Sequence, residues 1–282
     1  PDTGSGTTSH RGASVGTATS ALTLDNPAGS FGASTALDHG LTTPDQLWVS
    51  ARLFHRGNID DLITGAVARV IRKLRSSDTL ESFHFERGWE GGPHVRLHLL
   101  SPDPSKIAVI RETITSYAGR YFAEHPSPSS PDAEVAYRAS AARMAAVEGR
   151  TTFDPHLRPT DTVEFVPYVF DHDTYGNGPA REAAEHQFAE SSRIALRMIQ
   201  SGTSLEHRHS ALLGMLMLTL AVLEPDIEAA ARRVRRIVAP SESIPRAGAA
   251  LRRQARDLWS CAAGTGRYPL RGPLLAWLRS MR

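Results

Sequence analysis

Cysteine and lysine are nearly absent from this chain of 282 residues. The chain has one cysteine, Cys261, which excludes an internal disulfide and a thiolate metal cluster. Its helical surroundings predict a small packed residue. Lysine occurs only at Lys73 and Lys106, so arginine carries nearly all the positive charge. A lysine Schiff base therefore has almost no candidates, whereas arginine is well suited to carboxylates and peptide carbonyls.

Long apolar runs are also lacking. The stretch from Ala211 to Leu223 is too short to span a membrane, and its composition predicts a buried helix. The N-terminus shows no basic segment followed by an apolar one, so we expect no signal peptide. These absences predict a cytoplasmic protein that does not interact with a membrane.

The remaining composition indicates one folded region. Residues 1–45 are rich in Gly, Ser, Thr and Ala without a sustained period, so we expect them to be disordered. Residues 46–282 are expected to form a single domain, because strand and helix patterns follow one another without a linker. Strands are predicted at 48–54, 83–86, 94–100 and 162–170, the last interrupted at Pro167 and placed at an edge. Helices are predicted at 59–75, 105–123, 133–147, 180–199, 205–223, 226–238, 247–262 and around Trp277.

This order predicts an α+β fold, in which helices cover one face of an antiparallel sheet and the C-terminal part is helical. The other sheet face is unusually polar. Side chains alternate along a strand, so one face of the sheet should carry imidazoles, a guanidinium and a carboxylate. These residues are His84, Glu86, His94, Arg96 and His98, with Trp48, Ser50 and Arg52 beside them and Glu164 and Tyr168 as extensions. Such a face is either a wetted surface or the floor of a reaction cleft.

A metal or nucleotide site is not expected. His94 and His98 lie roughly 13 Å apart on a strand, and His207 and His209 point about 200° apart on a helix, so neither pair chelates an ion. The connection 88–93 lacks the lysine and serine of a phosphate loop, which argues against a nucleotide cofactor. The arginine run 232–236 predicts a solvated helix face and not a nucleic-acid site.

A second informative block is the turn and helix spanning residues 175–193. Pro179 is favoured in a first helical turn. Glu185 and Ser192 belong to a polar stripe, for which a solvated helix face is the default interpretation.

At these two blocks the chain resembles a known family. The segment 48–54, Asp60-Asp61-Leu62, the strand Gly91-Gly92-Pro93-His94-Val95-Arg96-Leu97-His98, and Tyr175-Gly176 followed by Glu185 and Ser191-Ser192 carry the resemblance. The family is the thiopeptide-type bacteriocin biosynthesis domain, which is the C-terminal elimination domain of lantibiotic dehydratases. It also occurs alone as the thiopeptide pyridine synthase. The resemblance spans about residues 46–225.

The resemblance implies an enzyme that acts on a leader-bearing precursor peptide without a cofactor, with other biosynthetic enzymes of the same pathway as further partners. Two reactions are implied by this family. An elimination domain removes glutamate from glutamylated Ser or Thr. A pyridine synthase joins two dehydroalanines in a formal [4+2] cycloaddition, then eliminates water and the leader peptide.

One departure from the family pattern favours the cycloaddition. Elimination domains usually place a second arginine two residues after the first, and here Arg96 is followed by His98. The loss of one guanidinium weakens a pocket for a glutamyl carboxylate. The strand containing Trp48 and Ser50 also looks like that of the pyridine synthases.

We therefore expect a pyridine synthase in which Arg96 and His98 bind the amide that reacts as its imidic tautomer. His55, Ser50 or Tyr168 would assist the dehydration, and Trp48 and Trp89 would stack on azole rings of the substrate. The remaining candidates for substrate binding are His84, Glu86, His94, Glu185 and Ser192. The alternatives are a stand-alone lyase that removes glutamate and a non-catalytic module that binds the precursor peptide.

Overall fold

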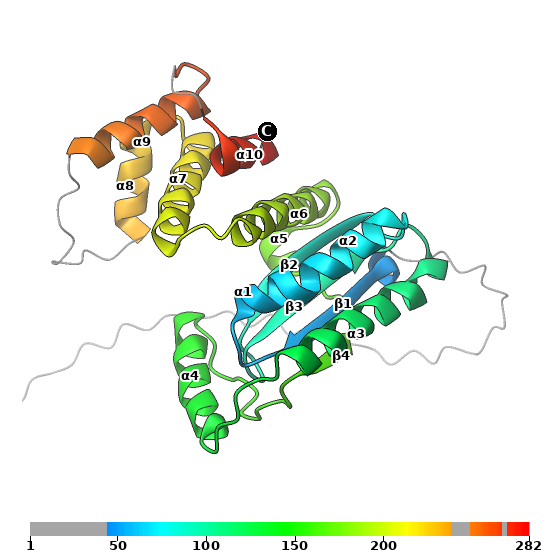
Figure 1. Cartoon of the computed structure of the whole chain (residues 1–282). Coiled ribbons are helices and arrows are strands. Elements are labelled where there is room, and N and C mark those ends of the chain that lie inside the picture. The colour runs from blue at the N-terminus through cyan, green and yellow to red at the C-terminus, as the bar shows by residue number, and fades with distance from the viewer. Residues whose placement is uncertain (1–43, 238–248, 267–269, 282) are drawn as a thin grey trace, which may run out of the picture. The chain divides into compact units, whose positions relative to one another are not determined.

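The computed structural model describes residues 44–237, 249–266 and 270–281 (Figure 1). Apart from its last two residues, the N-terminal segment 1–45, which the sequence predicts to be disordered, lies outside the described residues. The described strands form one antiparallel sheet in the order β2-β3-β1-β4. Their bounds are β1 Trp48–Phe54, β2 Ser82–Gly88, β3 His94–Leu100 and β4 Thr162–Val166. The structure is therefore of mixed α and β type, as the sequence predicts.

One sheet face is apolar and covered by helices. The helices α1 (Ile59–Leu62) and α2 (Ala68–Ser76) are joined by a π-helical turn, Ile63–Val67, and α3 (Ile107–Glu124) lies beside them (Figure 1). Their apolar side chains pack with those of β1 and β3 in the main core. The sequence predicts one continuous helix over 59–75, and the π-helical turn is a feature that it does not indicate. Asn58 caps α1 as expected, because its side chain accepts from the Asp60 N–H at 2.9 Å.

The edge position predicted for the fourth strand is confirmed, but the strand is shorter than expected. β4 pairs only with β1 among the described strands and ends at Val166, directly before Pro167. Proline has no N–H for a further ladder bond, which ends the pairing at this point. Residues 167–178, which we call the strap, then lead through the short helix α5 (His172–Tyr175) to α6 (Pro179–Gln200).

Helix α6 contacts β2 and supports the edge of the sheet. The Ser192 hydroxyl accepts from the Phe85 N–H at 3.0 Å, so the edge of β2 has a side-chain partner in place of another strand. The solvated helix face expected for Ser192 is wrong, because this residue is 4% exposed. The remaining described helices are α4 (Ala133–Val147), α7 (Leu205–Leu223), α8 (Ile227–Ile237), α9 (Ala249–Ala262) and α10 (Gly272–Ser280).

The helix α7 corrects a second expectation. The sequence predicts that residues 211–223 form a buried helix, and Leu218 is indeed fully buried in a small core with Leu258 and Leu278. However, Leu212 is 58% exposed and Leu216 is 56% exposed. Composition alone cannot show which side of an apolar helix is covered. None of the described helices could cross a membrane alone, although α7 and residues 227–236 meet the length and composition criteria as a pair bent by 108°.

Candidate active site

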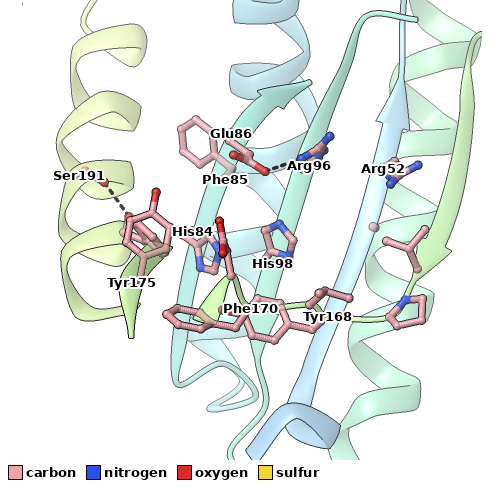
Figure 2. Close-up of a pocket in the computed structure, with 16 residues that line it drawn as sticks. Arg52, His84, Phe85, Glu86, Arg96, His98, Tyr168, Phe170, Tyr175 and Ser191 are labelled. Carbon is pink, nitrogen blue, oxygen red and sulfur yellow. Dashed lines mark hydrogen bonds and ion pairs between the residues drawn. The ribbon is translucent and has the colours of Figure 1, made fainter. Parts of the chain in front are cut away.

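A cavity of about 710 Å³ lies on the polar face of the sheet (Figure 2). We call it the sheet pocket. Side chains from β1, β2 and β3 line it on the sheet side, while the strap and α6 supply the opposite wall. The polar and aromatic lining residues are Arg52, His84, Glu86, Arg96, His98, Tyr168, Phe170, Asp171, Tyr175, Phe188 and Ser191.

Two stacked imidazoles lie in this pocket. His84 on β2 pairs with His98 on β3, and their ring centroids are 4.5 Å apart with an interplanar angle of 22°. The Ser50 hydroxyl of the neighbouring strand β1 lies 2.7 Å from His98 Nδ1. Ser50 is buried, so this contact fixes the orientation of the His98 ring. In contrast, His84 Nδ1 is buried without a hydrogen-bond partner in the described part of the chain.

Burial keeps both rings neutral. Desolvation lowers the pKa of His84 to about 4. Desolvation also lowers the pKa of His98 to about 3, with further contributions from the positive charges of a protonated His84, Arg96 and Arg52. Near pH 7 each ring therefore has one nitrogen that donates and one that accepts. This arrangement suits proton transfer between two neutral forms of a substrate.

Each arginine of the sheet pocket has a carboxylate of its own. Arg96 Nη1 donates to Glu86 Oε1 at 3.1 Å, and Figure 2 shows this pair above the His84 and His98 rings. Arg52 Nη1 lies 3.9 Å from Glu164 Oε2 across the β1–β4 ladder, an ion pair without a hydrogen bond. Arg52 and Arg96 are direct cross-strand neighbours, so two guanidiniums and two carboxylates occupy one region of the sheet. Their charges balance.

An aromatic wall limits the pocket on the side of the strap. Tyr168 stacks on Trp48 with a centroid distance of 4.7 Å and meets the His98 ring edge-on at 5.4 Å. The Tyr168 hydroxyl donates to Glu185 Oε1 at 3.1 Å, and Arg181 holds the same carboxylate. Burial, reinforced by the charge of Glu185, raises the pKa of Tyr168, so its hydroxyl stays protonated. Trp48 and Glu185 thus position Tyr168 without lining the pocket themselves.

The structure brings together most of the residues predicted for the site, but it places four of them elsewhere: His55, His94, Trp89 and Ser192, which bonds the Phe85 backbone. His55 is buried beyond the end of β1, where its Nδ1 lies 2.7 Å from Asp161 Oδ1 and 3.0 Å from the Ser127 hydroxyl. Its ring faces Tyr121 and Phe122. This cluster does not line the sheet pocket.

His94 and Trp89 lie at the turn between β2 and β3. His94 is fully buried, bonds Gly92 O through Nδ1 at 2.8 Å, and packs against Phe54. Trp89 donates its indole N–H to Glu148 at 2.8 Å and lies under the Arg150 guanidinium, so its ring is engaged within the protein. Neither residue lines the pocket, although His94 Nε2 accepts from Arg96 Nε at 3.3 Å and so helps to position that arginine.

Several lining residues were missed by sequence reasoning. Arg52 was assigned to the correct face, but its pairing with Arg96 depends on strand order, which alternation does not reveal. Phe170, Tyr175 and Phe188 have apolar rings in a turn and a helix, where packing is the ordinary interpretation. The described residues contain no group of three or more His, Cys, Asp or Glu that could hold a metal ion.

Comparison with known proteins gives the family. The family model described as "Lantibiotic biosynthesis dehydratase C-term" matches residues 48–267, and the chain therefore belongs to this family. This result confirms the resemblance predicted from the sequence. It places the chain among the domains that mature ribosomally made peptides, and supports an enzymatic role.

The fold is shared with a solved structure. The pyridine synthase TbtD from thiomuracin biosynthesis matches with a TM-score of 0.58 at 20% identity, over 83% of this chain and 79% of that chain. The tRNA-dependent lantibiotic dehydratase MibB from Microbispora sp. 107891 matches with a TM-score of 0.40 at 18% identity, over 68% of this chain and 15% of that chain. No curated protein sequence matches the chain.

Proposed function

We propose that this protein is a pyridine synthase that joins two dehydroalanines of a precursor peptide. The charge balance of the sheet pocket carries this proposal. Arg96 and Arg52 already have Glu86 and Glu164 as partners, and the two imidazoles are neutral. A neutral diene and dienophile fit such a pocket, whereas a glutamyl carboxylate would meet the Glu86 carboxylate in the lining and compete with Glu164 for Arg52.

The reaction requires one amide to react as its imidic tautomer. In that form the amide proton has moved from nitrogen to the carbonyl oxygen, which creates the conjugated C=C–N=C unit. His98 is suited to this transfer, because Ser50 occupies Nδ1 and leaves Nε2 for the substrate. Arg96 would donate a hydrogen bond to the same oxygen. Both contacts stabilise the reacting tautomer without a net change in charge.

Two carbon–carbon bonds then form between this unit and the second dehydroalanine. Loss of water and elimination of the leader as an amide make the six-membered ring aromatic. Most of the rate enhancement would come from holding two parts of one peptide together, which supplies about 7–11 kcal/mol in well-oriented intramolecular reactions. The aromatic wall of Tyr168 and the strap would exclude water from the reacting atoms.

Glutamate elimination is the second candidate, and one observation favours it. Arg52 lies directly opposite Arg96, so the pocket contains two guanidiniums although the second arginine of the β3 motif is replaced by His98. A carboxylate that entered would compete with Glu86 and Glu164 for these guanidiniums, although Arg52 Nε has no hydrogen-bond partner among the described residues. The third candidate, a binding module without turnover, predicts no chemical change in the peptide.

Mass spectrometry of a dehydrated precursor peptide, and of its glutamylated counterpart, distinguishes these functions. Loss of the leader with loss of water indicates cyclisation, loss of glutamate alone indicates elimination, and binding without a mass change indicates a module. Arg96→Gln and His98→Asn should each abolish turnover while circular dichroism stays unchanged. Full activity in both variants would reject the assignment of the sheet pocket as the active site.

A further inference from the structure

A second cavity of about 420 Å³ lies between α6, α7 and α10. We call it the apolar groove. Its walls include Phe85, Ile194, Met198, Leu212, Leu216 and Trp277. A volume in this range, lined by aromatic and aliphatic side chains, is typical of a ligand-binding pocket.

The polar atoms of the groove are already bonded within the protein. The Ser192 hydroxyl is held by the Phe85 backbone, and the Thr219 hydroxyl donates to Met215 O at 2.9 Å while accepting from Trp277 Nε1 at 2.9 Å. The Ser191 hydroxyl donates to Phe188 O at 2.9 Å. An occupant therefore meets mainly hydrocarbon and aromatic surface, which selects apolar groups.

Part of the apolar surface of the groove is not covered by any of the described residues. Leu212 and Leu216, one turn apart on α7, are each more than half exposed, while Leu218 on the same helix is fully buried. Adjacent exposed leucines beside a cavity are typical of a binding surface. Met198 and Met215 add flexible side chains that adapt to different shapes.

The groove and the sheet pocket are neighbours. Phe85 and Ser191 line both cavities, and Figure 2 shows these two residues at the border of the sheet pocket beside α6. We propose that the apolar groove binds apolar side chains of the same peptide whose reacting residues occupy the sheet pocket. This inference rests on the proposed function. Because the cavities share two residues, the bound side chains belong to positions close to the reacting dehydroalanines.

The groove thus acts as a specificity subsite. It would favour substrates with Phe, Leu or similar residues near the ring-forming positions over substrates with polar residues there. Apolar burial in the groove would lower KM, because it binds substrate and transition state equally, and would leave kcat unchanged.

The test compares two peptides on variants of α7. Both peptides carry two dehydroalanines, flanked in one by Phe and Leu and in the other by Ser. The variant Leu212→Ser/Leu216→Ser removes exposed groove side chains without opening the core. Leu213→Ser is the matched control, because Leu213 is 42% exposed on the same helix and lies outside the groove.

We expect the double variant to raise KM for the apolar peptide by about tenfold with kcat unchanged. The polar peptide and the Leu213→Ser variant should keep wild-type constants. Equal effects on both peptides, or no effect on either, would overturn the inference. A wild-type dimer in sedimentation velocity that the double variant abolishes, with peptide kinetics unaltered, would also overturn it and assign the groove to a second copy.

A direct binding measurement separates this inference from the proposed function. With 5-fluorotryptophan incorporated, the ¹⁹F resonance of Trp277 should shift when the apolar peptide is added and stay in place with the polar peptide. That result would support the groove even if mass spectrometry showed no cyclisation. Conversely, cyclisation of both peptides at equal KM without a Trp277 shift would overturn the groove and leave the proposed function intact.

Discussion

The Ser50 hydroxyl lies 2.7 Å from His98 Nδ1, although the two residues are 48 positions apart in the sequence. The antiparallel register of β1 and β3 places them directly opposite each other. Ser50 is 1% exposed, so water cannot replace its hydroxyl. The orientation of the His98 ring, and the identity of the nitrogen that faces the substrate, therefore depend on this serine.

Removal of this hydroxyl should impair catalysis more than binding. In Ser50→Ala, the His98 ring loses its fixed orientation, and we expect kcat to fall about tenfold, the equivalent of one lost hydrogen bond. KM should change less than twofold. Steady-state kinetics measure both constants. Ser140→Ala, which removes an exposed hydroxyl on α4, is the control and should leave them unchanged.

The buried imidazoles should make stability depend on pH. The pKa values of His84 and His94 fall to about 4, and that of His98 falls to about 3, chiefly because of burial. Below about pH 6.5 these imidazoles bind protons in the unfolded chain, whereas in the folded protein they stay neutral to a lower pH. The free energy of unfolding is therefore highest above about pH 6.5 and decreases as the pH falls.

We expect the free energy of unfolding in urea to be lower at pH 5 than at pH 7, by about 2 kcal/mol for each of these imidazoles. The variant His98→Asn removes one of these groups and should show a shallower dependence between pH 7 and pH 4. A dependence as steep as that of the wild type would contradict the burial of this imidazole.

The Glu86 carboxylate should protect the pocket from competing carboxylates. In Glu86→Gln, Arg96 loses its partner, and we expect a glutamylated peptide to bind a few-fold more tightly, in keeping with a partly exposed ion pair. Fluorescence competition with a labelled peptide measures this change. Glu134→Gln breaks the exposed pair with Arg138 on α4 and should have no effect. Weaker binding in Glu86→Gln would contradict the proposed role.

The Tyr168 ring, rather than its hydroxyl, should matter for turnover. In Tyr168→Phe the ring can still stack on Trp48, and only the bond to Glu185 is lost. We expect kcat to stay within about threefold of the wild type, because the lost charge-assisted bond joins Tyr168 to Glu185 and not to the reacting peptide. Tyr168→Ala should reduce turnover much more. A hundredfold loss in Tyr168→Phe would instead identify the hydroxyl as a proton donor.

The cluster around Asp161 should support stability and not catalysis. Asp161 has a φ of 60°, accepts from the Ser127 N–H at 2.8 Å, and lies 2.7 Å from His55 Nδ1. Asp161→Ala loses these bonds and keeps an unfavourable backbone angle, so we expect the free energy of unfolding to fall by about 2–3 kcal/mol.

Asp161→Asn tolerates the same backbone conformation and should lose less stability. In both variants, and in His55→Gln, the folded protein should keep its kcat. Reduced kcat in His55→Gln with unaltered stability would restore His55 as a catalytic candidate.

Much of the fold was accessible from local patterns. Period-two alternation assigned Val49, Ala51 and Leu53 to the core face of the sheet, and all three are buried in the main core. It assigned Ser50 and Arg52 to the opposite face, where they pair with His98 and Arg96. The helix patterns gave α4 and α7 their observed bounds. The patterns could not show that Leu212 and Leu216 remain exposed, because an apolar helix offers no polar stripe that marks its outer side.

The sequence by itself determined which residues share a strand face and which family the chain resembles, because neighbouring positions and short motifs carry that information. Only the tertiary structure decided that His84 stacks on His98, that Arg52 stands beside Arg96, and that His55 and Trp89 lie outside the sheet pocket. Strand order and the path of the strap bring together segments far apart in the chain. Such contacts depend on how the whole domain packs, and the periodicity of a single strand or helix carries no information about that packing.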